Sequence, residues 1–137
     1  MILSPQTIQV ARDGAVADAT VSWRLEGMQW VVEIDSPAFE TVEAKADDAF
    51  EALCLVRAEL EPLGWRIGVA GAQPDVWPSG MARDQGGGLS AYRMTSRGGE
   101  SMVDTFEPVD PATVTTVDEQ RALIDRIFDE ISRGGDR

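Results

Sequence analysis

The segment from residue 71 to residue 88 concentrates side chains that could bind or react with another molecule. It combines an indole, a hydroxyl, a guanidinium and two carboxylates with two prolines and three consecutive glycines, and a tyrosine follows shortly after. An irregular loop of this length is uncommon inside a compact domain and often carries function. The candidate binding residues are therefore Asp75, Trp77, Ser79, Arg83, Asp84 and Tyr92.

Two interpretations of this loop stay open. In the first, Trp77 supplies contact area on an exposed recognition surface and Arg83 gives that surface direction, because Trp and Arg are frequent energetic anchors. In the second, the loop is structural: Trp77 covers the core and Arg83 pairs internally with Asp75 or Asp84. The residue types are compatible with both interpretations.

A run of three glycines, Gly86 to Gly88, closes the loop. Its backbone amides could cradle an anion. However, the Gly-Lys-Ser/Thr ending of a phosphate-binding loop is missing, and the dinucleotide-binding glycine spacing does not occur in its required context. The sequence favours a flexible connection between the loop and the next strand.

No catalytic or metal-binding motif is visible. The absence of histidine excludes a Ser-His-Asp triad and a His-ligated metal, and a single cysteine excludes a multi-cysteine site within one chain. Ser79 does not match the nucleophile elbow of hydrolases. Cys54 is expected to be a small buried hydrophobe beside the apolar stripe of a helix. We expect no metal and no cofactor, and leave enzymatic activity open.

Strands are predicted on both sides of the loop. Residues 19–25 alternate between apolar and polar types, and residues 28–34 predict a hairpin partner across Glu26-Gly27. The other expected strands are shorter, and the last two are joined across Gly98-Gly99. These shorter strands cover residues 7–10, 39–44, 65–70, 89–95 and 102–106.

Two helices are predicted by apolar stripes with helical spacing. The first begins at an Asp47 cap, and the second begins with a capping box formed by Thr116 and Glu119. Their expected buried faces are Ala49, Leu53, Val56 and Leu60 in the first helix, and Val117, Ile124, Ile127 and Ile131, flanked by Leu123 and Phe128, in the second. The paired acids near these helices need no catalytic explanation, because acids are common in a first helical turn.

This order of elements predicts one α+β domain over residues 1–137, with a mostly antiparallel sheet of five to six strands and two helices packed on one face. The apolar content of 43% is enough for a sizeable core. We find no apolar run long enough to span a membrane and no secretory signal, and the single cysteine fits a reducing compartment. A cytoplasmic location is therefore expected.

Charge is the strongest compositional signal. The chain has 24 acidic and 12 basic residues, a formal net charge of −12. This balance argues against binding nucleic acid or an anionic membrane, because both rely on basic side chains. It leaves a basic protein partner or simple solubility as the explanation.

Three stretches of the sequence are distinctive: Leu60-Glu61-Pro62-Leu63-Gly64-Trp65, Asp75-Val76-Trp77-Pro78-Ser79-Gly80-Met81 and Glu119-Gln120-Arg121. Through them, the chain from Phe50 to Phe128 resembles a group of small bacterial proteins without an established activity. This resemblance assigns no site residue. In size and acidity the chain is also similar to the immunity proteins of bacterial toxin systems.

Together these features predict a non-enzymatic protein-binding module, of the immunity type, that neutralises a basic protein such as a toxin nuclease domain. One alternative is a small-molecule enzyme or ligand-binding domain with its site at the loop of residues 71–88. Another is a scaffold whose helices mediate homo-oligomerisation.

Overall fold

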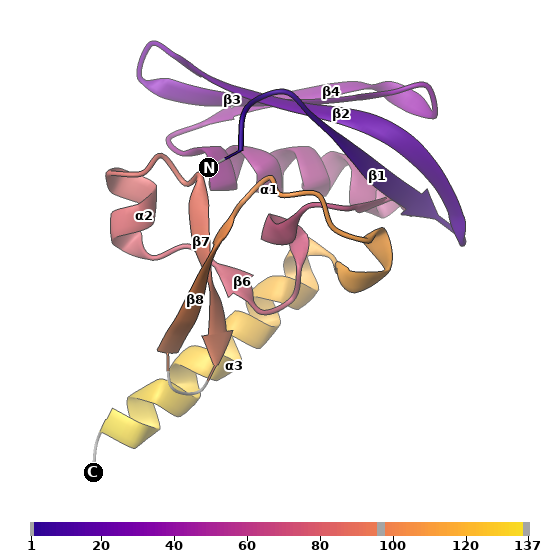
Figure 1. Ribbon diagram of the computed structural model, residues 1–137. Coiled ribbons are helices and arrows are strands. Elements are labelled where there is room, and N and C mark those ends of the chain that lie inside the picture. Colours follow the sequence, from indigo (N-terminus) through magenta and orange to yellow (C-terminus); the bar gives the residue numbers. More distant parts are fainter. Residues whose placement is uncertain (1, 96–97, 136–137) are drawn as a thin grey trace.

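An antiparallel meander opens the computed structural model, which describes residues 2–95 and 98–135 (Figure 1). Tight turns join its strands, and the first turn uses the positive φ angles of Asp13 and Gly14, which suit a two-residue hairpin. The hairpin predicted across Glu26-Gly27 is confirmed, with its turn residues at Gly27 and Met28. The four strands are β1 (Gln6–Arg12), β2 (Ala15–Glu26), β3 (Gln29–Ser36) and β4 (Phe39–Ala46).

A fifth strand, β5 (Arg66–Ile67), pairs with β1 and completes a sheet of order β4-β3-β2-β1-β5. The strand predicted at 65–70 is shorter than expected, because the chain turns into a 3-10 helix, η2 (Ala70–Ala72). Gly68 allows β5 to lie close to its neighbours, since an added Cβ there would stand 2.5 Å from two backbone oxygens. The short β5 brings the chain back to the core before the candidate loop begins.

The first helix, α1 (Ala49–Leu60), packs on the meander and buries all four residues of its predicted stripe. Its cap is Asp48 and not the predicted Asp47: the Asp48 carboxylate accepts a hydrogen bond of 2.8 Å from the Glu51 backbone N–H. Phe50, Cys54 and Arg57 are buried as well. The helix is therefore covered on more than the face that meets the meander.

The second layer over α1 contains a three-stranded sheet of order β6-β7-β8. Both Gly98 and Gly99 pair with β7, so the turn predicted there is wrong, and the connection at residues 96–97 lies outside the described residues. Buried side chains of this sheet, including Val76 and Ala91, pack against Phe50 of α1. The strands are β6 (Val76–Trp77), β7 (Ser90–Thr95) and β8 (Gly98–Asp104).

The last helix, α3 (Val117–Gly135), packs against α1, β7 and β8 (Figure 1). Half of the predicted capping box is confirmed, because the Thr116 hydroxyl accepts from the Glu119 N–H at 3.2 Å. The Glu119 carboxylate instead accepts from the Thr115 hydroxyl. No helix within the described ranges is long and apolar enough to cross a membrane.

The α+β class and the mostly antiparallel pairing are confirmed, with three refinements. The strands divide between two sheets, and only α1 of the two predicted helices lies on the larger sheet, since α3 contacts the smaller one. A third, short helix, α2 (Gly80–Asp84), lies within the segment predicted to be irregular.

A buried polar network joins the two layers. Arg57 is fully buried and donates to the Glu61 carboxylate at 2.9 Å and to the Gln120 side-chain oxygen at 2.7 Å. Gln120 in turn donates to the carbonyl oxygens of Gly71, Gln73 and Val76. Because Val76 directly precedes Trp77, this network fixes the backbone from which the candidate site is built. The 3-10 helix η1 (Glu61–Leu63) begins at Glu61 of this network, and η3 (Pro111–Thr113) lies between Val76 and Gln120 in sequence.

Candidate functional site

The candidate loop of residues 71–88 is more regular than its sequence indicates. It contains η2, β6 and α2, and Ser79 caps α2 by accepting a hydrogen bond of 3.0 Å from the Ala82 N–H. The prediction of a loop without regular structure is therefore wrong. A two-residue strand and a five-residue helix are too short to show a hydrophobic period.

Arg83 attaches α2 to the start of α1. Its Nη1 lies 3.1 Å from an oxygen of Asp48 and 3.7 Å from an oxygen of Glu51. Its guanidinium also lies over the rings of Phe50 and Trp77, 5.3 and 5.4 Å from their centroids. The predicted internal pairing of Arg83 with Asp75 or Asp84 is wrong, because the partners come from another element.

The two candidate acids lie apart from this arrangement. Asp75 accepts from Arg93 at 3.2 Å, and Arg93 also donates to the Gln73 side chain at 2.7 Å. Asp84 is exposed, and its side chain makes no hydrogen bond or ion pair with any described residue. Neither acid lines the pocket that collects the other candidates.

Four of the six candidate residues, Trp77, Ser79, Arg83 and Tyr92, line one open pocket of about 600 Å³. Trp77 and Tyr92 are directly paired across β6 and β7, which places their side chains next to each other on one face of the sheet. We call this site the aromatic pocket; its remaining lining residues are Pro78, Gly80, Met94 and Phe128.

Phe128 is the aromatic lining residue that the sequence analysis did not assign to the site. The prediction placed it beside the buried stripe of the second helix, but 45% of its surface is exposed. Its position four residues after the buried Ile124 is compatible with burial, so the pattern gave no signal of the exposure. Aromatic side chains from β6, β7 and α3 thus meet at one opening.

The polar groups of the aromatic pocket are hydrogen-bond donors. Only Nη1 of Arg83 is bonded within the described residues, and the Ser79 oxygen accepts in the cap of α2 while its own hydrogen stays available. The Tyr92 hydroxyl is a further donor. No Asp or Glu lines the pocket, so Ser79 has no carboxylate base within it. The arrangement can stack against a ligand and donate to it, but it does not form a nucleophile and base pair.

The glycine run packs the loop closely on α1. Gly87 and Gly88 have φ angles of 66° and 73°, and the Gly87 carbonyl accepts from the Ala49 N–H at 2.7 Å. A Cβ on Gly88 would lie 2.6 Å from an Asp48 oxygen. Close approach and positive φ explain these glycines, and the neighbouring carboxylate of Asp48 disfavours an anion site.

Cys54 lies in the lining of a separate hollow of about 400 Å³ between α1 and the start of α3. It is 2% exposed, which confirms the prediction of a buried residue. Burial raises the pKa of its thiol to about 11, so the thiol is protonated near neutral pH. Over the described part of the chain, no group of three or more His, Cys, Asp or Glu residues is placed to hold a metal ion.

Neither a comparison with models of known protein families nor a search of curated proteins finds a match to this chain. Its likeness to small bacterial proteins and to immunity proteins therefore stays a prediction. The geometry of the aromatic pocket and the charge of the surface carry the functional argument.

Proposed function

We propose that the protein is a non-enzymatic protein-binding module and that the aromatic pocket is its anchor site. The observation that carries this proposal is the convergence of Trp77, Tyr92 and Phe128, from three different elements, on one open pocket beside Arg83. Trp, Tyr and Arg are the residue types that most often dominate the energy of protein interfaces. A partner would insert an apolar side chain between these rings.

Rigid support of the pocket favours this function. Trp77 packs edge-on against Phe50, with ring centroids 5.2 Å apart, and Arg83 holds the same region through Asp48. Gln120 fixes the backbone beside Trp77 by donating a hydrogen bond of 2.7 Å to the carbonyl oxygen of Val76. Walls that are already ordered lose little conformational entropy when a partner binds.

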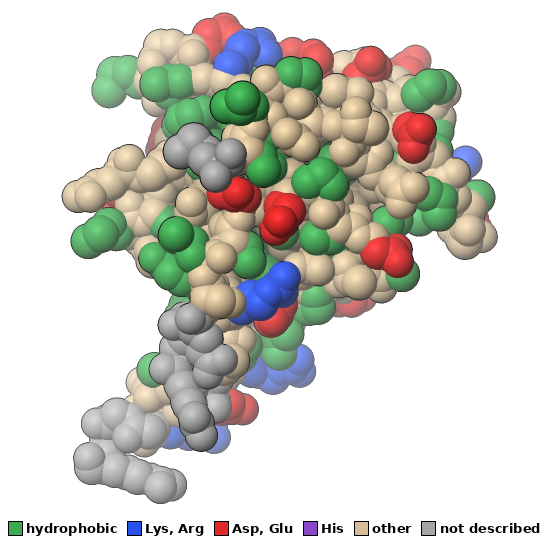
Figure 2. All heavy atoms as spheres, in the orientation of Figure 1, with side chains coloured by type: hydrophobic (Ala, Val, Ile, Leu, Met, Phe, Trp, Pro, Cys, Tyr) green, Lys and Arg blue, Asp and Glu red, His purple; other side chains and the backbone are tan. Residues whose placement is uncertain are grey.

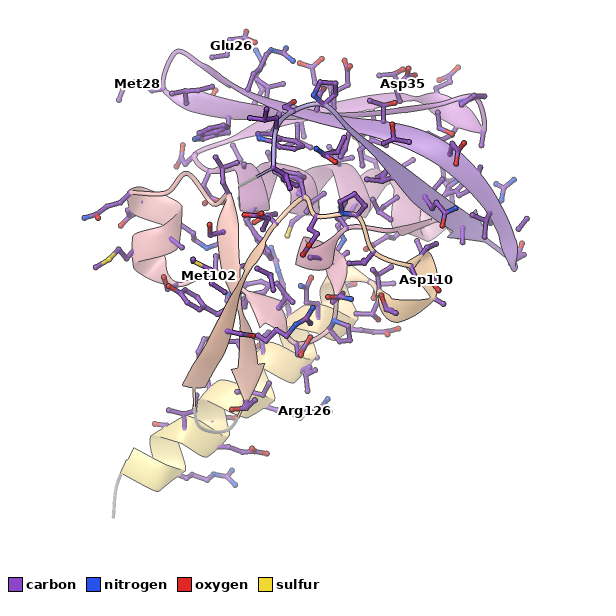
Figure 3. The ribbon with its side chains drawn as sticks, viewed as in Figure 1. Glu26, Met28, Asp35, Met102, Asp110 and Arg126 are labelled. Carbon is purple, nitrogen blue, oxygen red and sulfur yellow. The ribbon has the colours of Figure 1, made fainter. Side chains whose placement is uncertain are left out.

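The charge of the larger sheet supports a basic partner. On β3, Glu33 alternates with the buried Val32 and Ile34, so it points away from α1, and it stands directly opposite Glu43 of β4. Glu26 and Asp35 lie on the same outer side (Figure 3). Acidic side chains are spread over this upper part of the molecule (Figure 2), where Arg24 and Lys45 pair with Glu26 and Arg24 also pairs with Glu43. Such a surface would speed the association of a basic protein, as expected of an immunity-type protein.

A small-molecule binding site is the second candidate function. It is favoured by the concave shape of the aromatic pocket, about 600 Å³. It is also favoured by the Tyr92 hydroxyl and the guanidinium nitrogens of Arg83 other than Nη1, which have no acceptor among the described residues. Ligand pockets usually combine apolar walls with a few such polar groups. A ligand of this kind would be planar, largely apolar and a hydrogen-bond acceptor.

Phe128 is the best residue for testing the anchor. Trp77 and Arg83 hold α2 in place, so their removal would disturb the fold together with binding. Phe128 is 45% exposed, and Leu55 of α1, 42% exposed and outside the pocket, is a matched control. A photo-crosslinking amino acid at position 128, expressed in cells of the source organism, should capture a basic protein, whereas the same group at position 55 should not.

The captured partner then allows a quantitative test. Phe128→Ala should weaken its binding by about tenfold or more, the usual effect of truncating an aromatic anchor. Leu55→Ala should change the affinity by less than about twofold. Equal effects of the two substitutions would contradict the anchor role. Capture of an acidic partner would contradict the charge argument, and binding of a small molecule alone would favour the second candidate.

A further inference from the structure

A second surface of the molecule has the features of a docking site. Strand β4 forms one end of the five-stranded sheet, and no described strand pairs with its outer side. Alternate residues of an antiparallel edge strand direct their N–H and C=O groups away from the sheet, where they can pair with another chain. Six of the eight residues of β4 are paired with β3 along its inner side, and the register shifts at Glu40 and Thr41.

A groove of about 500 Å³ runs beside this edge, between β4 and the end of α1. Its apolar lining includes the buried Leu60 and the 61% exposed Leu63, together with Phe39 and Val42. The edge of the sheet and the groove thus offer backbone hydrogen bonds and apolar contacts side by side.

The charge of the groove is entirely acidic. Glu40, Glu43 and Glu59 line it, and no Lys or Arg does. Glu43 forms an ion pair with Arg24, whose Nη2 lies 3.4 Å from the Glu43 Oε1. Glu40 and Glu59 make no ion pair with any described residue. Two carboxylates at this edge therefore lack a counter-charge.

We propose that the β4 edge and its groove bind an extended basic segment of another protein, which adds to the five-stranded sheet as a sixth strand. This surface is separate from the aromatic pocket, with which it shares no lining residue, and the proposal does not depend on the pocket. The backbone of the segment would pair with β4. Its Lys or Arg side chains would cover Leu63 with their methylene stems and reach Glu40 and Glu59 with their charged ends.

A second copy of this chain is a poorer occupant of the same edge than a basic segment. β4 carries two glutamates and one lysine, and an antiparallel register that sets Glu40 opposite Glu43 would place like charges across the strand pair, which is destabilising. The acidic side chains therefore protect the edge from self-association while leaving it open to a basic strand.

The probe is an acetylated and amidated peptide that alternates Lys with Thr and Val over 8 residues, the length of β4. Titration into the isotope-labelled protein should shift amide signals at residues 39–46 and at the end of α1. A peptide of the same charge with N-methyl groups on every internal backbone nitrogen cannot donate to a strand edge in either orientation. It should bind at least about tenfold more weakly.

Charge-reversal variants test whether the peptide binds at the groove. The double variant Glu40→Lys with Glu59→Lys should weaken binding of the peptide by about tenfold or more, because it removes both unpaired carboxylates. The matched control is Glu107→Lys with Glu130→Lys, two exposed acids outside the groove that give the same change of net charge. The corresponding Gln variants repeat the test if a thermal melt shows that reversal disturbs the fold.

Three results would overturn the proposal: no binding of the peptide, equal binding of the N-methylated peptide, or equal weakening in the control variant. The last two would show attraction to the general charge of −12 rather than to a strand site. Phe128→Ala should leave peptide binding unchanged, so a failure here is distinguishable from a failure of the aromatic pocket as an anchor.

Discussion

At the scale of single residues, Cys54 shows how the second layer of the fold changes chemistry. It lies on the side of α1 that meets the three-stranded sheet and α3, where it packs with Phe50 and Val117. A thiolate there would lose its hydration, so the neutral thiol is favoured and its pKa rises to about 11. The raised pKa of Cys54 therefore depends on the packing of the second layer over α1.

This shift predicts a loss of stability in alkali. The pKa is raised in the folded state, so above about pH 8.5 the unfolded chain releases the thiol proton while the folded chain keeps it until about pH 11. The free energy of unfolding should therefore fall by about 1.4 kcal/mol per pH unit through that window. Urea melts at about pH 8 and about pH 10.5 should show this loss in the wild type. Cys54→Ala should be less sensitive, and equal pH dependence would contradict burial of the thiol.

The sequence predicted the burial of apolar side chains better than the burial of polar ones. Leu53, Val56 and Ile124 lie where their helical spacing put them, because burial of an apolar stripe is a local property of a helix. Arg57 and Gln120 are buried against the usual tendency of their types, and only the pairing of two elements 63 residues apart explains it. Such partners leave no trace in a local pattern.

At the scale of elements, Gln120 connects α3 with α1 and with the backbone that leads to Trp77. Gln120→Met keeps the size of the side chain and removes its hydrogen bonds to Arg57 and to three carbonyl groups. Groups left buried without partners are costly, so we expect a loss of about 3–5 kcal/mol in urea melts. The exposed Gln85 is the control, and Gln85→Met should stay within about 0.5 kcal/mol.

The two main helices differ in how deeply their apolar side chains are buried. Leu53 of α1 is fully buried, whereas Ile127 of α3 is 9% exposed. Leu53→Ala should cost about 2–5 kcal/mol, and Ile127→Ala should fall near the lower end of that range. Losses below about 1 kcal/mol in urea melts would mean that these faces are misassigned.

Short elements limited the prediction of the site. The sequence identified the segment and brought forward four residues of the aromatic pocket, but β6 and α2 span only 2 and 5 residues and carry no period. It also could not show that Phe128 and Met94 would face the same opening, because that depends on how α3 crosses β7.

At the scale of the whole molecule, the net charge of −12 predicts a steep salt dependence of binding. The rate of association with a basic partner should fall by about tenfold or more between low and physiological ionic strength, because the screening length shrinks. The dissociation rate, set by contacts at the aromatic pocket, should change far less. Stopped-flow mixing measures both rates, and an association rate independent of salt would rule out electrostatic steering.

The buried network joins parts of the chain that are synthesised, and can fold, at different times. The meander and α1 occupy residues 6–60 and contact each other locally, whereas Arg57 must wait for Thr115 and Gln120, which lie 58 and 63 residues further along the chain. Contacts that close such long loops form late in folding. On the ribosome, the acidic four-stranded meander would therefore be complete while Phe50 and Cys54 are still uncovered. The growing chain would then repel its own copies by charge during the interval in which its apolar side is exposed.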